Sequence, residues 1–175
     1  VTPFNFTSLA SNRNMTPVLM GNTTIWKPST TALLSNYHMM QIFMEAGLPA
    51  GVVNFLPGKG SLIGNVALNN PNLAGIHFTG STATFQGLWR GVGANIQNYK
   101  SYPRLVGETG GKDFIFAHNS AHAREVATAI VRGAFEFQGQ KCSAASRAYI
   151  PASLWNDVKQ YVGEMLSTIK MGDVT

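Results

Sequence analysis

The sequence has few charged residues, a single cysteine and no long apolar run. Charged side chains make up 12% of its 175 residues and hydrophobic ones 45%, which excludes an intrinsically disordered chain and indicates a packed core. A helix that crosses a bilayer needs about 20 consecutive apolar residues, and we find neither such a run nor a recognisable signal peptide. We therefore expect a globular protein without a membrane segment.

Because Cys142 is the only cysteine, no disulfide can form within the chain. A single cysteine is a candidate nucleophile in an intracellular enzyme, whereas the commoner role of a free cysteine is that of a small buried hydrophobe. Lys141 precedes it, and an ammonium group that faced the sulfur would favour the reactive thiolate. The residue alone leaves both roles open.

The basic surplus is small and dispersed. The chain has 13 basic and 8 acidic residues, a formal charge of +5. A nucleic-acid-binding protein gathers such charge on one face or in one run, but here it is scattered over Arg13, Lys27, Lys59, Arg90, Lys100, Arg104 and Lys112. We expect a mildly basic surface that favours small anionic ligands, and no nucleic-acid partner.

The histidines do not form a metal-binding pattern. His118 and His122 are four residues apart, but the only acids near them are Asp113 and Glu125, and no third ligand stands at a suitable spacing. We therefore expect no metal site.

Short β-prone runs alternate with amphipathic helical patterns along the chain, which predicts a parallel sheet covered by helices. Strands are expected at residues 23–26, 52–56, 74–78, 104–106, 114–116 and 146–150. The first helix should bury one face, formed by Leu33, Leu34, Tyr37, Met40 and Met44. The helical pattern after residue 120 should bury Val126, Ile130, Ala134 and Phe135. The last helical pattern, after residue 153, should bury Leu154, Val158, Tyr161, Val162, Met165 and Ile169.

Hydroxyl residues stand before three of these helical patterns. Ser29 or Thr30, Ser120 and Ser153 are each placed to cap the helix that follows, since a side-chain oxygen at this position accepts a hydrogen bond from the first turn. We predict these three helix starts from them. Gly47, followed by Pro49, should end the first of the helices.

Two glycine-containing turns follow predicted strands and are candidate phosphate sites. Gly80-Ser81 opens a helix, and the backbone N–H groups and dipole of a helix start attract phosphate; a plain turn with a capping serine is the alternative. Gly58 begins a pattern, Gly58-x-Gly60-x-x-x-Gly64, that is one residue longer than the dinucleotide fingerprint. Lys27 ends the first strand, at the edge where ligands bind in such sheets, although it could equally be a solvated surface lysine.

Glu108 is a lone acid among glycines in Gly107-Glu108-Thr109-Gly110-Gly111. We interpret this stretch as a break after strand 104–106 and as the candidate domain boundary. Flexible glycines would let the carboxylate reach into a cleft and act as a general base. A solvated loop acid is the alternative.

Five short motifs occur in a fixed order along nearly the whole chain. They are Pro3-Phe4-Asn5-Phe6, Trp26-Lys27-Pro28-Ser29, Phe78-Thr79-Gly80-Ser81, Gly107-Glu108-Thr109-Gly110-Gly111-Lys112 and Gly139-Gln140-Lys141-Cys142-Ser143. In order and spacing they resemble the aldehyde dehydrogenase family. The resemblance implies an α/β fold in which a parallel-sheet, Rossmann-like NAD-binding domain, residues 1–107, is followed by the start of an α/β catalytic domain, residues 108–175. We expect the chain to be an internal segment of such an enzyme.

The resemblance also implies roles for single residues. Cys142 would be the nucleophile that attacks the aldehyde, Glu108 the base that activates water, and the Asn5 amide a donor to the oxyanion. A cofactor site would be formed by Lys27, Pro28, Ser29, Gly58, Gly80 and Ser81. NAD is the expected cofactor. NADP is the alternative, because Thr30 stands where many NAD-preferring relatives have an acid, which would repel the extra phosphate of NADP.

Within the family the sequence is most similar to the branch that acts on Δ1-pyrroline-5-carboxylate, whose open form is L-glutamate 5-semialdehyde. Pro3-Phe4-Asn5-Phe6-Thr7, Phe85 and residues 99–104, 135–144 and 153–155 carry this similarity. It implies NAD-dependent oxidation of this small aldehyde to L-glutamate in proline catabolism, in the mitochondrial matrix, by a homo-oligomer when full length. Ser143 would contact the substrate's α-carboxylate, and Phe6 and Phe137 would wall its aliphatic part.

Two other interpretations remain open. The protein could be an aldehyde dehydrogenase with a different aldehyde substrate. The chain could also be a catalytically silent segment that serves only as a structural or binding piece.

Overall fold

In a computed structural model that describes residues 1–173, the chain divides into two compact units, one ending at Thr109 and the other beginning at Gly110. Every strand pair is parallel. In the first unit β1 (Thr24–Trp26) pairs with β2 (Val53–Phe55), and β3 (Gly75–Thr79) pairs with β4 (Arg104–Glu108). In the second unit β5 (Asp113–Phe116) pairs with β6 (Ala145–Tyr149). The predicted parallel α/β class is confirmed; the functional roles of the two domains stay a prediction.

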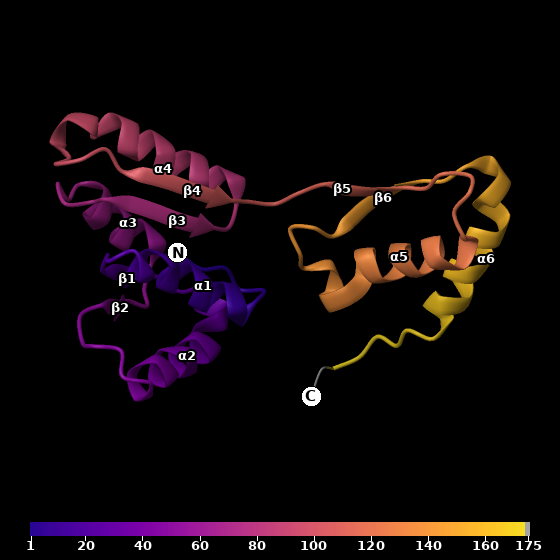
Figure 1. The fold of residues 1–175 in the computed structure, drawn as a ribbon, viewed down its shortest axis with the longest axis horizontal. Coiled ribbons are helices and arrows are strands. Elements are labelled where there is room, and N and C mark those ends of the chain that lie inside the picture. Colours follow the sequence, from indigo (N-terminus) through magenta and orange to yellow (C-terminus); the bar gives the residue numbers. More distant parts are fainter. Residues whose placement is uncertain (174–175) are drawn as a thin grey trace. The chain divides into compact units, whose positions relative to one another are not determined.

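Helices follow the strands in both units. The first unit contains α1 (Thr7–Leu19), α2 (Leu33–Glu45), α3 (Gly60–Leu68) and α4 (Thr82–Ala94), with short 3-10 turns at Thr30–Ala32 and Ile96–Asn98. The second contains α5 (Ala123–Phe135), a 3-10 turn at Glu136–Gly139 and α6 (Ala152–Ser167). Figure 1 shows α4 alongside the β3–β4 pair, and α5 alongside β5 and β6. Among the described residues no helix is long and apolar enough to cross a membrane.

The first two residues connect the two strand pairs of the first unit. The Val1 nitrogen donates to the His77 carbonyl at 2.8 Å, and the Val1 carbonyl accepts from the Thr79 N–H at 3.2 Å. These two bonds flank one residue of β3, as the slanted bonds of a parallel pair do. Thr2 N–H donates to the carbonyl of Lys27, directly after β1. Val1 and Thr2 therefore lie between the carboxyl ends of β1 and β3.

Trp26 is the centre of the core under β1 and β2. Its side chain is fully buried, its ring packs edge-on against Phe55 with centroids 5.0 Å apart, and its indole N–H donates to the Thr2 hydroxyl at 2.9 Å. Burying a large apolar side chain stabilises a fold by roughly 1.5–3 kcal/mol. Ala10 of α1 and Val53 of β2 complete the buried set, and α2 packs against it through Met39, Met40 and Phe43.

The second unit has its own core. Val158 of α6 and Ala127 of α5 are fully buried, and Val126 and Ala117 are nearly so. The predicted apolar face of α6 packs against them through Leu154, Tyr161, Val162 and Met165. Ile169, predicted to be buried with that face, lies beyond the helix and is about half exposed.

The three predicted hydroxyl caps are wrong. The Ser29 hydroxyl lies 3.1 Å from that of Thr31, and α2 begins only after the intervening 3-10 turn. Ser120 bonds the His118 ring at 2.9 Å, so His122 occupies the position before α5. Ser153 lies inside α6, which begins directly after Pro151. The Ser29 and Ser120 hydroxyls each bond a local side chain instead of a helix start, and the sequence could not rank those partners.

The apolar face predicted for α2 is also wrong in part. Met40 packs on the Trp26 core, but Leu34, Tyr37 and Met44 are exposed by 70%, 47% and 42%. Apolar residues surround this helix on most sides, so their spacing permits more than one stripe, and packing against β1 selects the one through Met40 and Phe43. Phe135 at the end of α5 is likewise about half exposed rather than buried.

Candidate functional site

Several predicted site residues of the first unit gather where parallel strands end. Lys27 directly follows β1, Gly80 and Ser81 directly follow β3, and Glu108 is the last residue of β4. The Gly80 N–H donates to the Glu108 carbonyl at 3.1 Å. Carboxyl ends of parallel strands form the ligand-binding edge of open α/β sheets. The structure thus brings together, at one edge, the predicted cofactor residues Lys27, Gly80 and Ser81 and the predicted base.

Lys27 points toward the turn that begins α3. Pro28 behind it is fully buried and Lys27 itself is partly buried. A β-carbon built on Gly60 would lie 3.9 Å from Cε of Lys27, so the lysine stem runs beside the first residue of that helix. An ammonium group and helix-start N–H groups on one edge suit an anionic, hydroxyl-bearing ligand. These features fit a dinucleotide.

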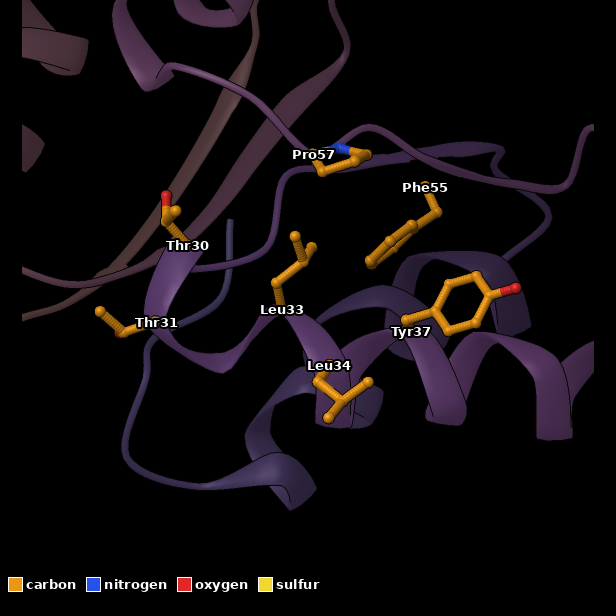
Figure 2. A pocket seen from close by; sticks show the side chains of 7 residues that line it. All are labelled: Thr30, Thr31, Leu33, Leu34, Tyr37, Phe55 and Pro57. Atoms are coloured by element: carbon orange, nitrogen blue, oxygen red, sulfur yellow. The ribbon is translucent and has the colours of Figure 1, made fainter.

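An apolar hollow of about 500 Å³ opens beside this edge (Figure 2). Its lining residues come from the 3-10 turn after β1, from the first two turns of α2 and from the end of β2 with the segment after it: Thr30, Thr31, Leu33, Leu34, Tyr37, Phe55 and Pro57. In Figure 2 the Leu33 side chain and the Phe55 and Tyr37 rings stand close to one another. Thr30, at which the family resemblance leaves the choice between NAD and NADP open, lines this hollow next to the predicted cofactor residue Ser29.

Ser81 caps α4. Its hydroxyl accepts from the Thr84 N–H at 3.3 Å and lies 2.7 Å from the Thr84 hydroxyl. This is the structural role that the sequence offered as the alternative. The exposed position of Ser81 at the helix start also supports the phosphate role, which stays a prediction.

Glu108 does not lie in a flexible loop, so that expectation is wrong. It is the last residue of β4, paired in register with Thr79 of β3. Its carboxylate Oε2 lies 3.0 Å from the guanidinium of Arg13, and its side chain is 56% exposed. The position is therefore defined by a strand and an ion pair, while much of the carboxylate faces solvent.

Close packing, and not a need for flexibility, explains the glycine at position 107, directly before Glu108. A β-carbon on Gly107 would overlap the ring of Phe85. That ring is stacked on Phe78 with centroids 5.8 Å apart, and Trp89 follows at 5.9 Å. Gly107 therefore lets α4 pack closely on β4, which keeps the strand regular up to Glu108.

In the second unit, Cys142 is exposed. It occupies a turn with Ser143 that is closed by the Ala144 N–H donating to the Lys141 carbonyl at 3.2 Å, just before β6. A thiol on a solvent-facing turn is accessible to a small electrophile, and the alternative of a buried structural cysteine is wrong. A β-carbon on Gly111 would overlap the Cys142 carbonyl oxygen, so the backbone of Cys142 is seated directly on this glycine.

Lys141 does not face the sulfur. Its ammonium pairs with the Glu136 carboxylate, whose other oxygen lies 3.0 Å from Arg132 of α5. The hydrogen bonds from Lys141 and then Arg132 lower the pKa of Glu136 to about 2. The proposed activation of the thiol by this lysine therefore has no geometric support.

Between Glu136 and Lys141 the backbone makes a left-handed turn. Phe137, Gln138 and Gly139 have φ of 52°, 54° and 69°. Only glycine adopts this region without cost, and a non-glycine residue there stores roughly 1–3 kcal/mol. Strained residues of this kind persist where the surroundings hold them, and here the ion pairs of Glu136 close the turn.

The remaining predicted residues lie near these two groups. Asn5 is partly buried between the Val1–Thr2 link and α1, and Phe6 stands directly before that helix. Ser143 is exposed beside Cys142, and Phe137, in the left-handed turn, is 48% exposed. Asn5, Phe6 and Glu108 belong to the first unit, and Cys142, Ser143 and Phe137 to the second. Among the described residues no group of histidine, cysteine and acidic side chains could hold a metal ion.

Sequence reasoning missed Arg13 and Glu136. Arg13 was counted as part of a basic surface, but it is only 8% exposed. Its position on α1 among polar residues gives no signal of burial. For Glu136 a signal existed, since Arg132, Glu136 and Lys141 are spaced four and five residues apart, within reach across a helix end.

Comparison with known proteins gives a consistent result. A sequence model described as "Aldehyde dehydrogenase family" matches residues 1–175. The chain is 51% identical over 174 residues to a mitochondrial Δ1-pyrroline-5-carboxylate dehydrogenase of Dictyostelium discoideum, covering 98% of this chain and 31% of that protein. To the human mitochondrial protein of the same name it is 47% identical over 173 residues, covering 99% and 31%.

Solved structures agree. The NAD-bound Δ1-pyrroline-5-carboxylate dehydrogenase of Mycobacterium tuberculosis superposes with a TM-score of 0.94 at 56% identity, covering 98% of this chain and 32% of that one. An NAD-bound enzyme of that name from Thermus gives 0.86 at 35% identity, covering 92% and 31%. The chain thus spans about a third of the length of these relatives.

Proposed function

Because the chain belongs to the aldehyde dehydrogenase family, we propose that it carries the nucleophile, the base and most of the dinucleotide site of an NAD-dependent enzyme. The proposed reaction is the oxidation of L-glutamate 5-semialdehyde, the open form of Δ1-pyrroline-5-carboxylate, to L-glutamate in proline catabolism. The observation that carries the proposal is the exposed thiol of Cys142 on a turn held by Gly111. The names of the relatives support the substrate and the cofactor.

The strand-end edge of the first unit would hold the cofactor. The Lys27 ammonium would donate to ribose hydroxyls, and the N–H groups after Gly80, with the Ser81 hydroxyl, would donate to the pyrophosphate. Pro28, Ser29 and Gly58 shape the backbone around these donors. When bound, NAD⁺ supplies the acceptor for a hydride. Thr30 carries no charge, so NADP remains the alternative cofactor.

Cys142 begins the reaction. Its thiolate sulfur forms a bond to the aldehyde carbon, and the carbonyl electron pair moves to the oxygen. The Asn5 side-chain amide and the Cys142 N–H donate to this oxyanion; the loss of one such donor costs about 3–4 kcal/mol of barrier. As the carbonyl re-forms, a hydride leaves the carbon, and a thioester on Cys142 remains.

Glu108 completes the reaction. Its carboxylate accepts a proton from water, whose oxygen bonds to the thioester carbon. The carbon–sulfur bond then breaks and the thiolate is restored. The net change is aldehyde, NAD⁺ and water to carboxylic acid, NADH and a proton.

Three residues would hold the substrate. The Ser143 hydroxyl, next to the nucleophile, donates to the α-carboxylate, and the Phe6 and Phe137 rings pack on the aliphatic chain. By the same resemblance we propose a homo-oligomer. The mitochondrial names of the Dictyostelium and human relatives support a mitochondrial matrix location.

The nucleophile and base are tested by two variants of the full-length protein. Cys142→Ser should abolish NADH production while NAD binding, measured by calorimetry, is retained. Glu108→Gln should give a rapid burst of one NADH per site and then a stall, because hydride transfer precedes hydrolysis. Full turnover by Cys142→Ser would disprove the nucleophile assignment, and steady turnover without a burst by Glu108→Gln would disprove the base assignment.

The substrate is tested separately with wild-type protein. Turnover with Δ1-pyrroline-5-carboxylate should exceed that with simple aliphatic aldehydes of similar length. The opposite order would favour an aldehyde dehydrogenase with another substrate. Absence of turnover with every aldehyde would favour a purely structural or binding role.

A further inference from the structure

Arg13 is a buried cation to which the reaction above gives no role. It lies on α1, and its side chain is 8% exposed. Its guanidinium nitrogens contact three side chains. One terminal nitrogen lies 3.0 Å from Oε2 of Glu108, and Nε donates to the Thr79 hydroxyl at 2.9 Å. The other terminal nitrogen donates to the Asn12 side chain at 3.1 Å. A buried charge is costly unless its donors are satisfied in this way.

These contacts span two strand ends. Thr79 and Glu108 are register partners and the last residues of β3 and β4. The planar guanidinium is a rigid fork of donors, so a contact to Thr79 on one side fixes the direction of the contact to Glu108 on the other. The ammonium of a lysine has rotatable donors and no planar fork, so it would not fix one contact direction relative to the other.

The ion pair leaves one side of the carboxylate available. It engages Oε2, and the Glu108 side chain remains more than half exposed. A general base needs one oxygen held in place and another directed at water. His77 of β3 also lies near this cluster; burial, and then the charge of Arg13, lowers the pKa of its imidazole.

We propose that Arg13 is a positioning residue that holds Glu108 by one carboxylate oxygen at the end of β4, so that the other oxygen is aimed at the hydrolytic water. This inference rests on the proposed function, since it needs Glu108 to be the base. It assigns to α1 a part in thioester hydrolysis and none in hydride transfer.

The test is pre-steady-state NADH production by the full-length protein. Arg13→Leu should keep the rate of the first NADH within about twofold of wild type and slow the following steady state about tenfold or more, as expected for a misplaced catalytic group. Thr79→Val, which removes only the second anchor of the guanidinium, should act in the same direction with a smaller effect. Arg13→Lys should restore turnover only in part.

The controls separate positioning from general damage. Arg90→Leu removes one exposed cation from α4 of the same unit and should leave both phases unchanged. In the double variant, Arg13→Leu should slow hydrolysis no further once Glu108→Gln is present, because both changes act through one group.

Four outcomes would overturn the inference: an equal fall of both phases in Arg13→Leu, no change in either, full rescue by lysine, or additive slowing in the double variant. If Glu108→Gln stalls and any of these outcomes is found, only the role of Arg13 is rejected, and the base assignment of Glu108 stands. No stall in Glu108→Gln would instead reject the base assignment, and the inference with it.

Discussion

The turn that carries Cys142, the proposed nucleophile, depends on Gly111, a glycine that the sequence indicated only as part of a chain break. A β-carbon on Gly111 would overlap the Cys142 carbonyl oxygen and lie 3.2 Å from Oδ1 of Asp113. At Gly110 a β-carbon would meet nothing within 4 Å. The two adjacent glycines therefore differ in purpose, and Gly111 is the one that lets the Cys142 backbone approach β5.

This contrast makes a matched pair of variants. Gly111→Ala should displace the Cys142 turn and lower aldehyde turnover at least tenfold, because reacting groups tolerate little misplacement, and should destabilise the fold by roughly 1–3 kcal/mol through overpacking. Gly110→Ala should leave both nearly unchanged. Enzyme assays and urea unfolding measure the two effects. Equal losses in both variants would show that the contact with Cys142 is not the cause.

Ion pairs of Glu136 connect the end of α5 to the loop that follows it. Glu136 joins Arg132 of the helix to Lys141 of the loop, across the left-handed residues Phe137 to Gly139. Its pKa is lowered to about 2 by the hydrogen bonds from Lys141 and Arg132. A carboxyl pKa lowered from 4.5 contributes its full stabilisation above pH 4.5, and this contribution is lost progressively as the pH falls from 4.5 to about 2.

We therefore expect this loop to stay closed at pH 4, where an ordinary exposed glutamate begins to take up protons. Glu136→Gln should open the loop at pH 4 and above, because the amide keeps the shape of the side chain but loses its charge. Faster amide hydrogen exchange at residues 137–142 would report the opening. Glu164→Gln, which changes an exposed glutamate of α6 that accepts a bond from Gln160, is the control. If both variants leave exchange in the loop unchanged, the ion pairs do not hold it.

At the scale of the whole chain, residues 1–173 form two core clusters with no common member. Trp26, Ala10 and Val53 form that of the first unit, and Val158 and Ala127 are the fully buried residues of the second. The first core is built from helices packed on β1 and β2, and the second from α5 and α6 together with residues that follow β5 and β6. Damage to one core should therefore be felt first in its own unit.

Val158→Ala tests this separation. Removing two buried methyl groups should cost roughly 1–3 kcal/mol and speed amide hydrogen exchange in α5 and α6 of the full-length protein before it does so in β1 and β2. Trp26→Phe, which removes the hydrogen bond to Thr2, should show the reverse order. Uniform acceleration along the chain in both variants would mean that the two units unfold as one.

Local pattern was sufficient for much of this protein. The alternation of β-prone runs and helical periodicities predicted the parallel α/β class, because each signal lies within one element. The contiguous motifs around Asn5, Lys27, Ser81, Glu108 and Cys142 predicted the family for the same reason. Details at helix starts failed, since a hydroxyl such as Ser120 has several partners within reach.

Contacts between distant segments depended on the folded chain. Arg13 meets Thr79 across 66 residues, Gly107 faces the Phe85 ring, and Gly111 lies under Cys142. Periodicity and motif carry no information about which side chain will stand opposite which after the strands pair and the helices pack. These juxtapositions make Glu108 a strand residue held by a buried arginine and direct Lys141 away from the thiol, because packing and electrostatics act through space and not along the sequence.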